Sequence, residues 1–340
     1  MLLSAVLILA GLFCWYGTLS KASFFWDSRK AQSLRNLIGD LATKVIYLVL
    51  GLVIIGCGLF LGGMKFYESR ADKLYDQGQY QEGLNIYYDL HKYMKDDINY
   101  LNGVAFGNYM TENYEEAEKY AQLSVDKNKK GNQDGSVLLA WSLNQQNKLS
   151  QAINALTEYL DKDSDNKLVH SELGSLYYSD SQYDKAAESY NKAIELDPTD
   201  GRNYLSLAEV YYQHQKFNDE IAIYNRMIEN SVEVAGREHD ETYKTIYYNL
   251  GVSYYSIENY QKAEESFAKA VELDKGDADG WYFLASSQAL LNKPAEVLKS
   301  LEEAFKLNRE YVQVVKTDAD FSAMLQNNDI ATLIKKYSKN

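Results

Sequence analysis

Proline and cysteine are scarce in this chain of 340 residues, which contains 2 of each. Because proline interrupts helices and stiffens linkers, its scarcity favours a continuous series of helices without proline-rich connections. Both cysteines, Cys14 and Cys57, lie in strongly apolar runs near the start of the chain. The polar remainder therefore has no disulfide, and its stability must come from helix packing.

Motifs for catalysis, metal binding and phosphate binding are also missing. The 4 histidines are far apart in the sequence and form no HxxxH or HExxH pair. The chain has no glycine-rich phosphate loop, no GxSxG elbow and no CxxC pair. The sequence therefore predicts a protein that is not an enzyme, with no catalytic residues, no cofactor and no metal site.

Basic residues are fewer than acidic ones, with 35 Lys and Arg against 48 Asp and Glu. The formal net charge is −13 at pH 7, and the excess of acidic residues lies beyond residue 63, because the segment before it is net basic. An acidic surface repels nucleic acid and anionic lipid headgroups. We therefore expect no nucleic-acid partner.

Two apolar runs, residues 1–19 and 45–63, are each near the roughly 20 residues that cross a bilayer. We interpret them as two membrane helices. A cleaved secretory signal is the alternative for the first run, but the run lacks a basic start and a small-residue cleavage site. A lipid-attachment box ending at Cys57 is an alternative for the second, although the apolar run continues beyond that cysteine. Gly58 and Gly62 have the spacing that permits close helix contact in lipid, within the hairpin or with a partner.

The connection between these runs, residues 20–44, is basic. It contains more Lys and Arg than the short flanks of the two runs, which places it in the cytoplasm by the positive-inside rule. Both termini and the remaining chain would then lie on the other side of the inner or plasma membrane. A cytosolic remainder is the competing topology. Phe24, Phe25 and Trp26 are typical interfacial anchors, followed by an amphipathic segment along the inner surface.

The polar remainder is built from a repeated pattern, which is clearest at residues 168–198. Leu173, Gly174 and Tyr177 share one face of a first predicted helix, and Ala186, Tyr190 and Ala193 share one face of a second. A small residue recurs at the Gly174 position in seven units. The recurrences are Ala71, Ala105, Ala140, Gly174, Ala208, Gly251 and Ala285. A second small residue follows twelve positions later, with Glu220 and Val297 as departures.

This pattern resembles the tetratricopeptide repeat, a helix-turn-helix unit of 34 residues. The resemblance implies an all-α fold, a right-handed superhelix of about seven repeats preceded by a two-helix membrane hairpin. The expected units are 64–97, 98–131, 133–166, 167–200, 201–242, 244–277 and 278–309. The array would thus span 64–309, with capping helices at 310–340 near 311–315 and 321–337.

Two junctions of this array are open to alternatives. The second membrane helix and the first repeat helix form either one rod or two helices kinked at Gly62 and Gly63. The insertion at residues 232–242 is expected to extend the second helix of its unit into a longer loop around Gly236. It is either a binding edge or a tolerated surface loop.

The resemblance further implies that the first helices of successive units line a concave groove. The residues expected to face this groove are Tyr75, Asn102, Phe106, Tyr109, Trp141, Asn144, Ser175, Tyr178, Glu209, Tyr212, Tyr248, Tyr255 and Tyr282. Phenol rings offer apolar faces and hydroxyls that bond a peptide backbone. The alternative is that these tyrosines contribute packing between neighbouring units.

The groove is acidic, which favours a neutral or basic, aromatic-tolerant segment of another protein over a terminal carboxylate. We therefore predict a membrane-anchored adaptor or scaffold for protein–protein interaction in an envelope-assembly or secretion complex. The alternatives are a subunit held in a membrane complex mainly through its hairpin, or a glycan-binding module.

Overall fold

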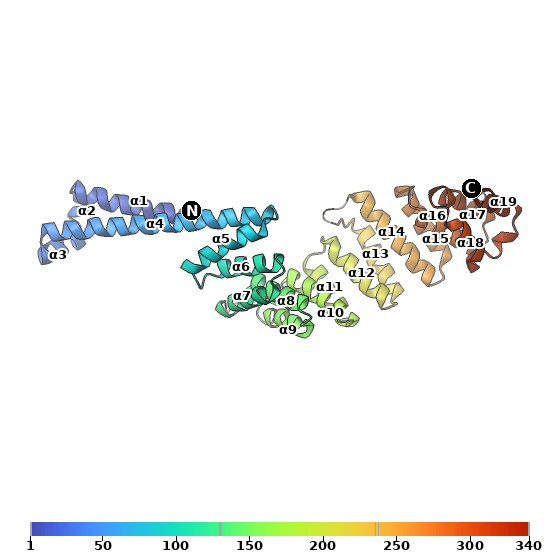
Figure 1. Ribbon diagram of the computed structural model, residues 1–340, viewed down its shortest axis with the longest axis horizontal. Coiled ribbons are helices and arrows are strands. Elements are labelled where there is room, and N and C mark those ends of the chain that lie inside the picture. Colours follow the sequence, from blue (N-terminus) through green and yellow to red (C-terminus); the bar gives the residue numbers. More distant parts are fainter. Residues whose placement is uncertain (1, 129–130, 235, 237, 339–340) are drawn as a thin grey trace. The chain divides into compact units, whose positions relative to one another are not determined.

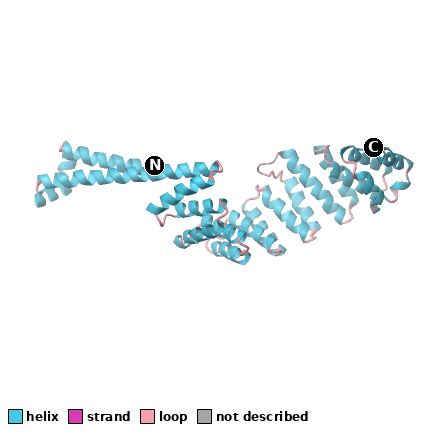
Figure 2. Ribbon diagram, in the orientation of Figure 1, coloured by secondary structure: helices cyan, strands magenta, loops and turns pink. Residues whose placement is uncertain are grey.

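The computed structural model describes residues 2–128, 131–234, 236 and 238–338. Within these ranges all regular elements are helices, α1 to α19 and two short 3-10 turns (Figures 1 and 2). The predicted all-α fold is confirmed. The chain forms two compact units, Met1–Lys148 and Leu149–Asn340, and each is described by itself.

The first unit begins with an antiparallel hairpin of α1 (Leu2–Leu19) and α4 (Asp40–Asp76), joined through α2 (Ser23–Trp26) and α3 (Arg29–Ile38). Small residues and polar groups line the contact between α1 and α4. The Ser4 hydroxyl donates to the Gly58 carbonyl at 2.7 Å, and the Trp15 indole donates to the Leu48 carbonyl at 2.8 Å. A Cβ atom on Gly58 would lie 2.9 Å from the Ser4 carbonyl oxygen, so glycine is required for this approach.

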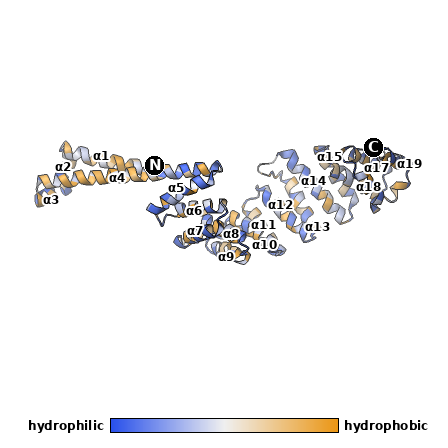
Figure 3. Ribbon diagram, viewed as in Figure 1, coloured by the Kyte–Doolittle hydropathy of each residue, from blue (hydrophilic) through white to orange (hydrophobic). Residues whose placement is uncertain are grey.

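The large apolar side chains of this hairpin point outward. The buried residues of α1 are Ser4, Gly11, Cys14, Gly17 and Thr18. Most of its leucines are exposed, as are several of those of α4, with Leu2 at 82% and Leu41 at 78%. Figure 3 shows the apolar part of α4 giving way to a polar part near its carboxyl end. By length and composition, α1 and α4 are both candidate membrane spans.

Helix α4 is one unbroken rod of 37 residues, about 56 Å long. It does not end or break at Gly62 and Gly63, which resolves the open alternative in favour of the rod. Its last part packs on α5 (Tyr80–Tyr93), so the helix that contains the second apolar run also supplies the first helix of the first repeat.

The remaining hairpins of the two units follow in chain order. The first unit continues with α6 (Ile98–Met110), α7 (Tyr114–Lys127) and α8 (Gln133–Gln145). The second unit contains α9 (Leu149–Leu160), α10 (Lys167–Ser179), α11 (Tyr183–Leu196), α12 (Gly201–Gln213), α13 (Phe217–Glu229), α14 (His239–Ser256), α15 (Tyr260–Leu273), α16 (Ala278–Leu290) and α17 (Pro294–Leu307).

One backbone turn recurs at the end of every first helix. An amide donates to the carbonyl five residues before it, at distances between 2.8 and 3.0 Å. The donors are Gln79, Asn113, Lys148, Gln182, Lys216, Asn259 and Lys293. The residue before each donor, which is Gly78 in the first copy, has positive φ, as a left-handed helix end requires. These donors recur with the same spacing as the small residues of the sequence pattern, because both belong to the same hairpin.

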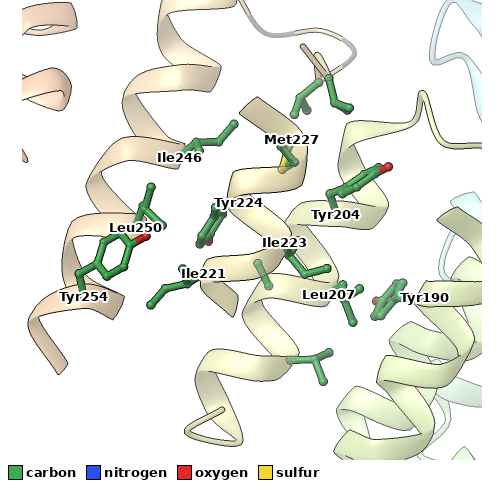
Figure 4. Packing of buried hydrophobic residues seen from close by; sticks show 14 of the residues in the cluster. Tyr190, Tyr204, Leu207, Ile221, Ile223, Tyr224, Met227, Ile246, Leu250 and Tyr254 are labelled. Atoms are coloured by element: carbon green, nitrogen blue, oxygen red, sulfur yellow. The ribbon is translucent and has the colours of Figure 1, made fainter. Parts of the chain in front are cut away.

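The small residues of the pattern are buried where paired helices meet. Ala71, Ala105, Ala140, Ala208 and Ala285 are all 0% exposed. In the second unit, one buried apolar cluster extends from α11 to α16. Figure 4 shows part of it, including Tyr190, Leu207, Tyr224, Ile246 and Leu250. Within the second unit, these hairpins therefore bury their apolar faces against one another, as a repeat architecture requires.

The insertion differs from the prediction. Helix α13 ends at Glu229 and is not extended; instead α14 begins early, at His239, and has 18 residues. Val232 and Val234 of the connecting loop are buried in the apolar cluster, which explains why this segment leaves α13. Gly236 lies in this loop with φ of +83°, whereas residues 235 and 237 of the insertion are outside the described residues.

The C-terminal cap also differs from the prediction. The helix expected at 321–337 is split into two 3-10 turns, Ala319–Phe321 and Met324–Gln326, followed by α19 (Asn328–Ser338). The Asn327 side chain accepts from the Asp329 amide at 2.9 Å and so starts a new helix there. The other cap helix, α18, spans Tyr311–Thr317.

Candidate partner-binding surface

Several residues expected to face the groove of the first unit are used in helix packing. The Tyr75 hydroxyl donates to the Gly103 carbonyl at 2.8 Å, and its ring stacks on Tyr87 with centroids 5.4 Å apart. Burial raises the pKa of Tyr75 above its ordinary range. The Phe106 ring meets Tyr75 edge-on at 5.2 Å. These contacts join α4, α5 and α6 to one another.

Asn102 is likewise committed to a polar contact between helices. Its side-chain oxygen accepts from the Ser124 hydroxyl at 2.6 Å, and Asn132 donates to the same hydroxyl at 2.7 Å. Tyr109, Trp141 and Asn144 remain partly exposed. The rings of Tyr109 and Trp141 lie 5.7 Å apart and form a small aromatic surface on α6 and α8.

At the end of the second unit, the chain covers part of the expected groove itself. The Tyr255 hydroxyl donates to the Asp320 carboxylate and lies 3.1 Å from the Ser286 hydroxyl. Tyr282 is 8% exposed, and its hydroxyl donates to Asp318. The segment between α18 and α19 therefore occupies the face where Tyr255 and Tyr282 would otherwise meet a partner.

The middle of the second unit keeps its predicted surface open. Ser175, Glu209 and Tyr212 are exposed, and Tyr178 is half-buried. Glu209 accepts from the Tyr178 hydroxyl at 3.2 Å and from the Gln213 amide at 2.8 Å. Tyr212 is 40% exposed, so much of its ring is available to a ligand. This open surface, defined by Ser175, Tyr178, Glu209 and Tyr212, comes from α10 and α12.

A cavity of about 320 Å³ adjoins the open surface. It is lined by Glu209, Tyr212, Glu220, Tyr224, Tyr248, Asn249, Val252 and Phe283. Burial raises the pKa of the Tyr248 hydroxyl to about 12, so the phenol is neutral at physiological pH. Ser175 lines a separate cavity of about 540 Å³ together with Glu172 and Arg202.

Glu220 was not expected at this site, although its position in the repeat was anomalous in the sequence. It is 2% exposed, and its Oε2 atom has no hydrogen-bond partner among the residues that the structure describes. Burial raises the pKa of this carboxyl to about 7, and the nearby Glu209 adds to the rise. The side chain is therefore an acid that titrates near neutrality inside an aromatic cavity.

Across the described residues, no group of three or more His, Cys, Asp and Glu side chains could hold a metal ion. The open surface and its cavity present aromatic rings, hydroxyls and carboxylates. Such groups bind a ligand through shape, hydrogen bonds and charge.

Family models match the part of the chain that forms this surface. A model described as TPR repeat matches residues 174–215, and a model described as Tetratricopeptide repeat matches residues 245–277. The chain carries tetratricopeptide repeats. Among solved structures, the C-terminal part of a TPR repeat-containing protein from Cytophaga hutchinsonii is similar with a TM-score of 0.58 and 15% identity. The match covers 76% of this chain and 99% of that one, and shows the shared tetratricopeptide fold.

Curated relatives share the repeats over part of their length. Stress-induced-phosphoprotein 1 of Caenorhabditis elegans is 28% identical over 183 residues, which cover 52% of this chain and 51% of the relative. The human protein O-mannosyl-transferase TMTC3 is 29% identical over 152 residues, which cover 42% of this chain and 16% of the relative. The chain thus spans about half of the first relative and a small part of the second.

Tetratricopeptide domains bind other proteins or peptides, and the proteins that carry them are generally non-catalytic scaffolds. At this level the chain is a protein–protein interaction adaptor. The similarity to the mannosyl-transferase lies in the repeats and transfers no catalytic activity.

Proposed function

We propose that this chain is a membrane-anchored adaptor that binds a segment of another protein on the open surface of its second unit. The observation that carries this proposal is the contrast between tyrosines along the repeats. Tyr75, Tyr255 and Tyr282 bond groups of the chain itself, whereas Tyr212 remains 40% exposed beside a cavity. Exposed aromatic rings beside a concave site are typical of interaction surfaces.

The distribution of apolar side chains in the α1–α4 hairpin supports membrane anchoring. The core helix of a soluble protein buries its large apolar residues, whereas only 11% of the apolar window of α4 and 28% of that of α1 are buried. In a bilayer, lipid would cover the exposed leucines and valines. By the positive-inside rule, the basic residues 20–44 favour a cytoplasmic loop with the repeats on the other side of the membrane, which suits an envelope-assembly or secretion complex.

The charge of the open surface supports a neutral or basic partner segment. Glu209 gives the surface negative charge, and the residues that line its cavity include Glu220 but no Lys, Arg or His. An acidic peptide would be repelled, and a cationic one attracted.

The hairpin contacts argue against the alternative in which the membrane helices make the main partner contact. A Cβ atom on Gly62 would lie 2.6 Å from the Ser4 hydroxyl oxygen of α1, and Gly58 is equally close to α1. The small residues that permit close helix contact are thus used inside the hairpin.

The proposal is tested by replacing Tyr178 and Tyr212 with alanine in the full chain. We expect recovery of crosslinked soluble partner after detergent extraction to fall at least tenfold, because the aromatic contact area is lost. The chain itself should stay in the membrane fraction. Tyr93→Ala, which removes a tyrosine that is 70% exposed elsewhere, is the matched control. Unchanged partner recovery with the double variant would contradict the adaptor and favour the hairpin-bound subunit.

A further inference from the structure

The second helix of every repeat has one position that is buried against the first helix. Across the repeats this position holds Gly83, Ala117, Ala152, Ala186, Glu220, Ala263 and Val297. All seven residues are buried in the structure. Six of them are small or apolar, as close helix packing requires, and Glu220 is a carboxylate.

Glu220 is not satisfied by the chain around it. Ser253 of α14 is a hydrogen-bond neighbour, but no residue in the described ranges bonds Oε2. A buried carboxylate with an unbonded oxygen is costly to maintain. Packing alone would favour alanine at this position, as in the neighbouring repeats. Binding of a ligand would explain why the position holds a carboxylate instead.

Among the described residues, no Lys, Arg or His lines the cavity that contains this carboxylate. Two lysines on neighbouring parts of the chain are engaged elsewhere. Lys216 pairs with Asp184 at 2.8 Å, and Lys244 pairs with Asp274 at 3.1 Å. The Arg226 guanidinium lies over the Tyr204 ring at 5.2 Å. Glu209 lines the same cavity and adds a second negative charge.

The cavity walls suit a long cationic side chain. Tyr212, Tyr248 and Phe283 contribute aromatic rings, and Tyr224 lies between α13 and α14 (Figure 4). Aromatic rings pack on an aliphatic stem and attract a cation over their faces. In a dry cavity, a charge-assisted hydrogen bond to a carboxylate is stronger than in water.

We propose that the cavity beside Tyr212 receives a Lys or Arg side chain of the partner segment, with Glu220 as its buried counter-charge and Glu209 at its mouth. This inference rests on the proposed function, because it presumes that a protein segment lies on the open surface. It adds the chemistry of one residue of that segment.

The test pans a random heptapeptide display library on the full chain in nanodiscs and measures binding of the selected peptides. Some selected peptides should lose binding when Tyr212 is replaced by alanine. We expect these peptides to share a Lys or Arg. Replacing that lysine by norleucine, which keeps the stem and removes the charge, should weaken binding at least tenfold. For a selected arginine, citrulline serves in the same way.

A double-substitution cycle, in which the glutamate of the protein and the lysine of the peptide are replaced separately and together, tests whether the cation binds in the cavity. Glu220→Gln should weaken binding of the lysine peptide at least tenfold and leave the norleucine peptide unchanged. Glu209 is exposed, so Glu209→Gln can be made without risk to folding and should produce a smaller loss, about threefold. Glu229→Gln, an exposed glutamate on the same helix, is the matched control and should have no effect.

The outcomes separate the two proposals. If no selected peptide depends on Tyr212, the proposed function fails and the cation site fails with it. If selected peptides depend on Tyr212 but bind equally well with norleucine or with Glu220→Gln, the surface binds a partner and the cation site is overturned.

Discussion

Replacing Phe267 by alanine is expected to destabilise the second unit by about 3–5 kcal/mol, the largest single loss that we predict. Phe267 of α15 is 0% exposed and stacks on Phe283 of α16 with centroids 5.6 Å apart. A Cβ atom on Gly251 of α14 would lie 2.7 Å from its ring. The ring thus joins two successive hairpins, and its removal leaves a cavity at their contact.

Calorimetry in detergent measures this loss as a fall in melting temperature on the order of 10 °C. Because the packing of a repeat array lies mainly between neighbouring hairpins, amide exchange should accelerate most in α14, α15 and α16. Leu290→Ala, at a side chain that is 36% exposed, is the control and should change little. An unchanged melting temperature would contradict the packing described for these hairpins.

Glu220→Gln is expected to stabilise the chain at pH 8 by up to about 3 kcal/mol and to change it little near pH 5. The pKa of Glu220 is about 7 in the folded protein against an ordinary value of 4.5. The folded state therefore holds this proton more tightly than the unfolded state does. The contribution of Glu220 to stability is fully present below pH 4.5 and is lost as pH rises through 7, where the buried carboxyl ionises. Glutamine stays neutral and avoids this cost.

Denaturant midpoints of the wild type and the variant at pH 5 and pH 8 test this pH dependence. Glu229→Gln should shift neither midpoint, because Glu229 is exposed. A variant less stable than the wild type at pH 8 would show that Glu220 has a favourable partner in the folded chain. A residue that lowers stability at neutral pH while aiding partner binding would be a functional compromise.

The repeat fold was predictable because it is periodic. A small residue such as Gly174 or Ala208 has to recur wherever two helices approach closely, and the structure buries it each time. The open surface was predictable in part for the same reason. Tyr178 and Tyr212 hold the same position of their first helices and both retain exposure in the second unit.

The features of the site that the sequence did not predict depend on contacts between residues far apart in the chain. Asp320 accepts from Tyr255, from which it is separated by 65 residues, and no local pattern indicates that the cap folds onto this tyrosine. Tyr75 has the same sequence setting as Tyr212 but bonds Gly103 of α6, the first helix of the following repeat. Glu220 was visible as a break in the pattern, whereas its cavity requires side chains from α12, α13, α14 and α16.

The central claim is that the open surface of the second unit contacts a partner protein. A photoreactive phenylalanine at Tyr212, introduced in the full chain and activated in native membranes, measures that contact directly. We predict a discrete crosslinked product at Tyr212 and none with the same group at Ala268, an exposed position on α15. No product at Tyr212, or equal products at both positions, would contradict the account.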